Sequence, residues 1–210
     1  YDQSQNRHTL FLSCIFLGIG LLDFMHTLSF QGMPVFITVN STNKTLQYWL
    51  TARTFMAASF LLSAYIQPVT RSFYLSKSVL LAINLALPVL ILVGTSFYLD
   101  HLPVAFLEGE GLTPFKKNSE YLVIFLLCLS IAAYWRRLAE PHTLYFISAF
   151  VVCIFSEAVL TGYKTAFDTY NLLGHVYKII AFYLIYKGLF ATSIKNPYCV
   201  LALSIASRPA

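Results

Sequence analysis

Six ionisable side chains lie inside segments of this sequence that are otherwise apolar enough to cross a lipid bilayer. They are Asp23, His26, Arg53, Glu157, His175 and Lys178. A charged side chain at the centre of a bilayer costs roughly 2.5–3.5 kcal/mol on insertion scales, so such residues usually face one another, water or a ligand. The pattern therefore predicts a polar pocket between helices within the membrane.

The two histidines suggest metal chemistry. A neutral imidazole nitrogen binds transition metals and serves as an axial ligand of haem iron. With Asp23 and Glu157 nearby, His26 and His175 would supply two nitrogen ligands and one or two oxygen ligands. Alternatively, each histidine hydrogen-bonds Asp23 or Glu157 and only holds helices together. The cofactor is therefore unknown, with haem or a transition metal as one hypothesis.

Arg53 allows two interpretations. In the first it forms a buried ion pair with Asp23 or Glu157, and loss of one partner would strand a charge. In the second its planar fork recognises a carboxylate or phosphate, while Trp49, on the same helix face, stacks on an aromatic or apolar group. We expect either a structural ion pair or a site for a small anionic or amphipathic ligand.

The composition argues against a water-soluble domain. Of the 210 residues, 58% are hydrophobic and only 11% are charged, whereas about 25% are charged in typical soluble domains. The net charge of +5 comes from scattered lysines and arginines, and no dense basic stripe indicates nucleic-acid binding. The sequence contains no phosphate-binding loop, nucleophile elbow or H-E-x-x-H motif, so this segment is not predicted to be an enzyme.

Six segments have the ~20 mainly apolar residues that a helix needs to cross the hydrocarbon core. They span about residues 8–30, 45–67, 77–99, 118–138, 142–163 and 170–192. Because lipid offers no partner for open backbone groups, continuous apolar runs of this length favour helices over strands. The sequence therefore predicts an all-α fold, a polytopic membrane helix bundle with six transmembrane helices.

The basic residues predict the orientation of these helices. They flank the turns after the second and fourth spans and the exit of the sixth, at Arg71, Lys77, Arg136, Arg137, Lys187 and Lys195. The other loops mix acidic residues with Lys116, Lys117 and Lys164, which argue weakly for the opposite orientation. The positive-inside rule then places both the N- and the C-terminus in the cytoplasm. In this topology the six ionisable residues lie in the outer half of the bilayer.

Helical spacing predicts that the polar residues of each helix share one face. Asp23 and His26 are three residues apart, and Trp49 and Arg53 are four apart, which places each pair on one side of a helix. Gly174 would let a neighbouring helix approach closely. We therefore predict one ligand site among the first, second, fifth and sixth helices. Its residues are Asp23, His26, Trp49, Arg53, Glu157, Asn171, His175 and Lys178.

Three motifs resemble the bacterial membrane-associated sensor domain MASE3. They are Asp23-Phe-Met-His-Thr-Leu-Ser-Phe-Gln-Gly-Met33, Trp49-Leu-Thr-Ala-Arg53, and Asp168-Thr-Tyr-Asn-Leu-Leu-Gly-His-Val-Tyr-Lys178 followed by Tyr183-Leu-Ile-Tyr186. The likeness covers about residues 8–198. It implies an input module of a bacterial signal-transduction protein in the inner (cytoplasmic) membrane. Such modules usually precede a PAS domain, the histidine kinase of a two-component system, or a diguanylate cyclase.

The resemblance leads to a functional expectation. Residues 1–198 would form the sensor domain, and residues 199–210 a short tail that either leads toward an output module or does not belong to the natural protein. Ligand binding would be relayed through the sixth helix to the output. Expected partners are membrane lipids, a small-molecule ligand and a second copy of the protein, but not nucleic acid. The alternatives are a haem- or metal-binding redox or gas sensor and a small transporter, because intramembrane acid–base pairs also line ion paths.

Overall fold

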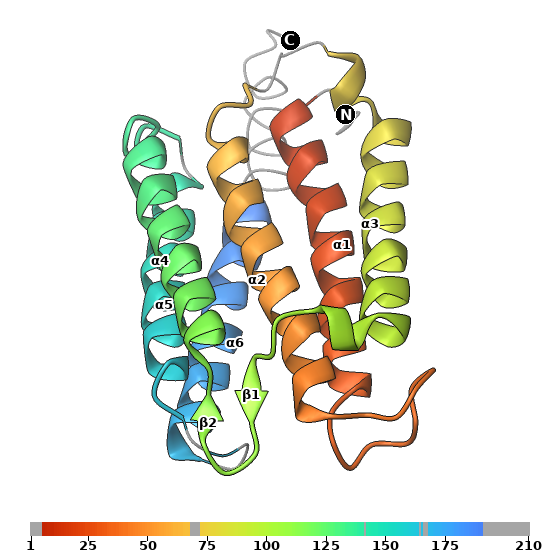
Figure 1. Cartoon of the computed structure of the whole chain (residues 1–210). Coiled ribbons are helices and arrows are strands. Elements are labelled where there is room, and N and C mark those ends of the chain that lie inside the picture. The colour runs from red at the N-terminus through yellow and green to blue at the C-terminus, as the bar shows by residue number, and fades with distance from the viewer. Residues whose placement is uncertain (1–5, 68–71, 141, 164, 166–167, 191–210) are drawn as a thin grey trace, which may run out of the picture.

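The structure, a computed structural model, is a bundle of six α-helices (Figure 1). It describes residues 6–67, 72–140, 142–163, 165 and 168–190. The helices are α1 (Arg7–Leu28), α2 (Thr42–Ser63), α3 (Lys77–Phe97), α4 (Pro114–Trp135), α5 (Thr143–Leu160) and α6 (Thr169–Phe190). Two 3-10 turns, η2 (Phe73–Leu75) and η3 (Leu99–His101), and a small hairpin of β1 (Phe106–Leu107) and β2 (Gly111–Leu112) lie between helices. The tail at 199–210 and the basic residues Arg71, Lys164 and Lys195 lie outside the described residues.

The predicted all-α class is confirmed, and the helices are those of a multi-pass membrane protein. Among the described residues, five helices are long and apolar enough to cross a membrane, namely α1, α3, α4, α5 and α6. Helix α2 has the same length as α1, 22 residues, but contains Lys44 and Arg53 and is less apolar. The sixth span and the cytoplasmic location of both termini stay predictions.

Side-chain caps set where three helices begin. Asn6, Ser41 and Thr113 each accept a hydrogen bond from the backbone N–H three residues later, at the start of α1, α2 and α4. Pro114, which needs no backbone N–H partner, follows the Thr113 cap. Helices α2 and α4 therefore begin at residues 42 and 114 rather than at the predicted 45 and 118, because the hydropathy of a sequence does not register polar caps. Helix α2 also ends earlier than predicted, at Ser63.

The helices pack in an order that differs from the chain. Helix α1 lies between α2 and α3, α2 contacts α4, α4 contacts α5, and α6 packs mainly on α5. In Figure 1, α5 and α6 lie behind α4 and α2. Gly174 permits the close approach of α5 and α6, as predicted, because a Cβ atom there would lie 2.5 Å from Leu160 Cγ. Ser156 Oγ of α5 also donates a hydrogen bond to Gly174 O, at 2.8 Å.

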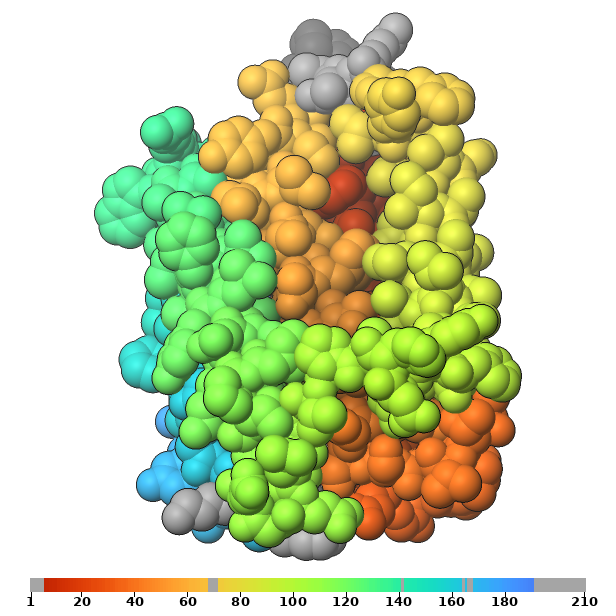
Figure 2. Space-filling view, viewed as in Figure 1, coloured from red at the N-terminus to blue at the C-terminus, as the bar shows by residue number. Residues whose placement is uncertain are grey.

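The two ends of the bundle differ. One end, which we call the hairpin end, carries the β-hairpin and the connections after α1, α3 and α5 (bottom of Figure 1). The other, where α1 begins, is the N-terminal end. In Figure 2 the connection between α3 and α4 runs across the face of the molecule and covers part of α2. Asn43 Oδ1 accepts from the N–H groups of Ala105 (2.7 Å) and Phe106 (3.3 Å), and Gln47 Nε2 donates to Pro103 O at 2.7 Å, so α2 holds this connection in place.

Candidate functional site

Charged side chains from five helices meet at the hairpin end of the bundle. They form three ion pairs: Arg53 with Asp23, Lys116 with Glu120, and Lys178 with Glu157. Five of the six side chains are 6% exposed or less, and only Asp23 is more exposed, at 27%. We call these six residues the charge cluster. Its three cations balance its three carboxylates, which is how buried charges are usually tolerated.

Trp49 lies at the centre of the cluster. The Arg53 guanidinium lies 4.5 Å from its ring centroid and the Lys178 ammonium 5.4 Å from it, both within the range of cation–π attraction. The indole Nε1–H donates to Glu120 Oε1 at 3.3 Å. The indole therefore contacts a member of each of the three ion pairs.

The histidines pack on the same indole. The ring centroids of His26 and His175 lie 5.1 and 5.3 Å from that of Trp49. His26 Nδ1 bonds Thr45 O at 2.9 Å, and His175 Nδ1 bonds Asn171 O at 2.8 Å. The partners expected in the alternative, Asp23 and Glu157, are therefore wrong, because both rings use backbone carbonyls instead. His26 does join two helices, since Thr45 belongs to α2.

The expected carboxylate and imidazole ligand set is not assembled. Within the described ranges, no three His, Cys, Asp or Glu side chains are grouped so that they could hold a metal ion. Asp23 and Glu157 are instead taken up by Arg53 and Lys178. A metal site with two histidines and one or two of these carboxylates does not fit this arrangement.

A cavity of about 490 Å³ opens beside the two imidazoles. His26, His175 and Asn171 line it from α1 and α6. Its apolar and aromatic walls include Phe30, Leu46, Phe106 and Tyr163. Gln31, Thr42, Glu108 and Gly109 line it from the loops, α2 and the hairpin. The volume suits a small ligand, and cavities of this kind, apolar with a few polar groups, are typical binding sites.

The structure brings the eight predicted site residues to one end of the bundle, in two groups. His26, Asn171 and His175 line the cavity. Asp23, Arg53, Glu157 and Lys178 belong to the charge cluster. Trp49 contacts both groups. Arg53 does not line the cavity, so an anion bound there would not contact its guanidinium.

Sequence reasoning missed the contribution of α4. Lys116 and Glu120 lie one helical turn apart near the start of α4, and both are fully buried. The sequence did contain a signal for Glu120, which lies near the start of the predicted fourth span. In the predicted topology this places it at the same membrane depth as the six ionisable residues identified first. Lys116 precedes that span, so the sequence alone places it in the loop.

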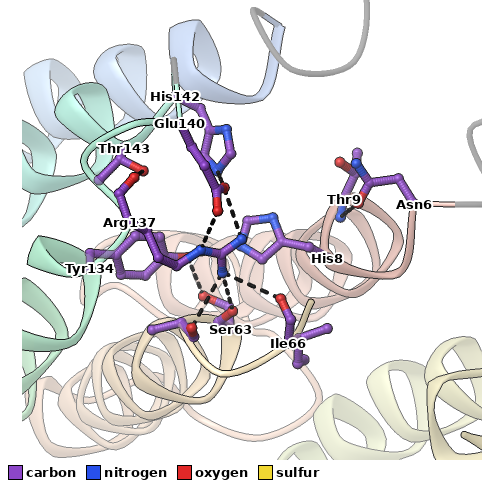
Figure 3. A network of polar contacts seen from close by, with 11 residues as sticks. Asn6, His8, Thr9, Ser63, Ile66, Tyr134, Arg137, Glu140, His142 and Thr143 are labelled. Carbon is purple, nitrogen blue, oxygen red and sulfur yellow. Dashed lines mark hydrogen bonds and ion pairs between the residues drawn. The ribbon is translucent and has the colours of Figure 1, made fainter. Parts of the chain in front are cut away.

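A second polar network lies at the N-terminal end (Figure 3). Arg137, in the turn after α4, binds both oxygens of Glu140 at 2.7 and 2.8 Å. Its Nη1 also lies 3.3 Å from the carbonyl oxygens of Ser63, Ala64 and Ile66, at the end of α2. Tyr134 Oη lies 3.0 Å from His8 Nε2 and 2.6 Å from Ser63 Oγ. This network joins α1, α2, α4 and the turn that leads into α5.

The comparisons with known proteins agree with the fold. The family model of MASE3, a membrane-associated sensor domain, matches residues 1–197. No curated protein and no solved structure matches the chain. A sensor domain is an input module and not itself a catalyst. The match spans nearly the whole sequence and includes every helix described above, so the chain belongs to the MASE3 family of membrane-associated sensor domains.

Proposed function

We propose that this sensor domain binds a small molecule in the cavity at the hairpin end and transmits the binding through α6 to an output module. One observation carries the proposal: both imidazoles that line the cavity also pack on Trp49. The same indole contacts Arg53, Lys178 and Glu120. A ligand that displaces either imidazole would therefore disturb the residue that connects three buried ion pairs.

Helix α6 is suited to transmit a ligand-induced displacement from the cavity to the other end of the bundle. It bears both His175 and Lys178 and is 22 residues long, about 33 Å at 1.5 Å per residue. Near its other end Gly188 lies close to Phe146 of α5, so the two helices stay in contact along their length. A ligand can shift the balance between two packings of these helices only by binding one of them more tightly.

The distribution of charge supports a cytoplasmic location for both termini. At the N-terminal end, Arg7, Lys77, Arg136 and Lys187 lie at or near helix ends. At the hairpin end, Lys116 is buried against Glu120, so it does not add to the charge of the loop, whereas Lys117 is exposed and does. The positive-inside rule then orients the cavity outward. The output would be a cytoplasmic kinase or diguanylate cyclase, the membrane the inner membrane of a bacterium, and the active form a dimer.

The test blocks the cavity in the full-length protein. Thr42 lines the cavity, and Thr42→Trp would fill part of it. Val39 precedes α2 in the connection from α1, does not line the cavity and is 78% exposed, so Val39→Trp is the matched control. We expect the output activity to become insensitive to growth conditions in the first variant and to remain responsive in the second. A Thr42→Trp protein that is folded and responds as the wild type does would contradict the proposal.

A further inference from the structure

The hydrogen bonds of the two cavity histidines define which of their nitrogens can meet a ligand. Thr45 O and Asn171 O are carbonyl oxygens, which only accept, so Nδ1 of His26 and of His175 must carry the hydrogen. In a neutral imidazole the other nitrogen, Nε2, then has a lone pair and no hydrogen. Each ring therefore offers a hydrogen-bond acceptor at Nε2.

These acceptors belong to residues that line the cavity, and nothing in the described part of the chain occupies them. Neither Nε2 has a hydrogen-bond partner within the described part of the chain, and neither is among the buried polar atoms that lack one. Both residues line the cavity. A nitrogen that is unpartnered but still accessible in such a residue is available to a hydrogen-bond donor on a ligand.

The charge of the cavity points to the same kind of ligand. Glu108, at the turn of the hairpin, is the only charged side chain among the described residues that line it. The three cations beneath, in the charge cluster, are each held by a carboxylate. Gln31 and Tyr163 can each donate a hydrogen bond but are neutral, so they suit a hydroxyl better than an anion. The described lining therefore includes two neutral imidazole acceptors, two neutral donors and one negative charge.

We propose that the cavity selects a small aromatic or aliphatic molecule with an ammonium group, accepts the matching alcohol less tightly, and rejects the matching carboxylate. The inference rests on the proposed function, since it names the ligand class of that same site. An ammonium has three hydrogens, and the cavity offers three acceptors in His26, His175 and Glu108. Phe30, Phe106 and Tyr163 would cover the rest of the molecule, and aromatic rings also attract a cation.

The fluorescence of Trp49 gives a direct measurement. The chain has two tryptophans, and Trp135, at the other end of the bundle, is 62% exposed, so Trp135→Phe leaves Trp49 as the only reporter. Phenethylamine, phenethyl alcohol and phenylacetate share one scaffold and differ in the head group. At neutral pH we expect a saturable change of Trp49 emission with the amine, a weaker one with the alcohol and none with the carboxylate.

Matched variants assign the effect to the named residues. Glu108→Gln should weaken the amine about fivefold, as for a partly exposed ion pair, and leave the alcohol unchanged. Glu110→Gln, on the same hairpin but outside the cavity lining, should change neither. His175→Phe keeps a ring beside Trp49 but removes an acceptor, so it should weaken both ligands, whereas His101→Phe, outside the lining, should not.

The outcomes separate this inference from the proposed function. Phenylacetate binding at least as tightly as phenethylamine would overturn the ligand class but retain a ligand site. No response to any of the three probes would also overturn the ligand class. In that case, loss of signalling in the full-length Thr42→Trp protein would still support the cavity as the sensory site. Wild-type signalling in that variant would count against the proposed function itself.

Discussion

At the N-terminal end, Arg137 uses its guanidinium on both oxygens of Glu140 and on three backbone carbonyls of the α2 terminus. At the hairpin end, Arg53 is even more deeply buried, at 1% exposed, but binds one carboxylate and the face of Trp49. Its Nε has no hydrogen-bond partner among the described residues. The first arginine therefore has nearly all its donors satisfied by Glu140 and the end of α2, whereas the second is held mainly by charge and by the rings of Trp49 and Phe182.

The same contrast extends to the neighbouring histidines. At the N-terminal end, His8 Nε2 is bonded to Tyr134, whose hydroxyl also contacts Ser63. At the hairpin end, Nε2 of His26 and of His175 has no hydrogen-bond partner among the described residues, and both residues line the cavity. The N-terminal network also contains one unpartnered atom, His142 Nε2, which is buried 3.0 Å from Glu140 Oε2. A buried network of this kind stabilises one packing of helices, while a network beside a cavity, with acceptors that lack partners, can respond to a ligand. We therefore interpret the N-terminal end as a clamp and the hairpin end as the sensory region.

The largest expected effect comes from breaking an ion pair in the charge cluster. Lys178→Met would leave Glu157, which is 0% exposed, without its cation. Removal of one partner of a buried pair typically costs about 3–5 kcal/mol, so we expect a loss of that order in the free energy of unfolding. Denaturant titration of the protein in mixed micelles would measure it.

A double variant tests whether the pairing itself is responsible. Glu157→Gln together with Lys178→Met removes both charges, so it should recover part of the loss seen in Lys178→Met. Additive losses in the two single variants would show that the two side chains act independently, against the ion pair. Lys187→Met, near the other end of α6, provides a control for loss of a lysine from this helix.

An intermediate effect is expected at the clamp. Arg137→Lys keeps the charge but loses the planar fork that reaches Glu140 and the carbonyls of Ser63, Ala64 and Ile66. Buried acceptors left unbonded cost about 1–3 kcal/mol, and we expect destabilisation in that range. Ligand affinity measured on the folded protein should not change. A weaker ligand affinity in this variant, but not in the exposed neighbour Arg136→Lys, would show that the two ends are not separate.

A smaller effect is expected at Glu120. Its Oε2 and that of Glu157 are buried without a hydrogen-bond partner among the described residues, and the two carboxyl groups interact with each other. In Glu120→Gln an amide N–H could bond Glu157, while the remaining oxygen still accepts from Trp49. Lys116 would lose its counter-charge but lies near the start of α4, where a long side chain can reach the surface. We expect a loss of about 1 kcal/mol, less than for Lys178→Met in the same titration.

The pairing of buried charges at the hairpin end could be predicted from the sequence for a physical reason. A charged residue in an apolar segment must find a partner inside the protein, so Arg53 was expected to pair with Asp23 or Glu157, and it pairs with Asp23. The choice between those partners depends on how α1, α2 and α5 pack, which spacing along one helix does not contain. The roles of these residues in ligand binding stay a prediction.

Other features could not be predicted because their partners are backbone atoms or distant helices. Arg137 was interpreted only as a topology signal, and its partners include three carbonyl groups that any residue would provide. The β-hairpin has strands of two residues, too short for an alternating pattern. Its glycines, Gly109 and Gly111, have φ angles of 87° and 92°, so the Glu-Gly-Glu-Gly segment forms a tight turn rather than an open loop.

The smallest expected effect is a change in how the stability of the N-terminal end depends on pH. His142 lies in the turn before α5, and burial lowers the pKa of its imidazole below the usual 6.5, with Arg137 acting in the same direction and Glu140 opposing both. As the pH falls below about 6.5, the unfolded chain therefore takes up a proton that the folded protein resists, and stability decreases. His142→Asn removes this contribution. Its unfolding temperature should fall less than that of the wild type between about pH 7 and 5. Identical slopes for the two proteins would contradict this, because His142 would then take up protons equally in the folded and the unfolded chain. A wild-type unfolding temperature that falls less than that of the variant would mean that the folded protein favours the protonated ring, paired with Glu140, whose Oε2 lies 3.0 Å from its Nε2; the clamp would then contain a titrating ion pair rather than a neutral ring.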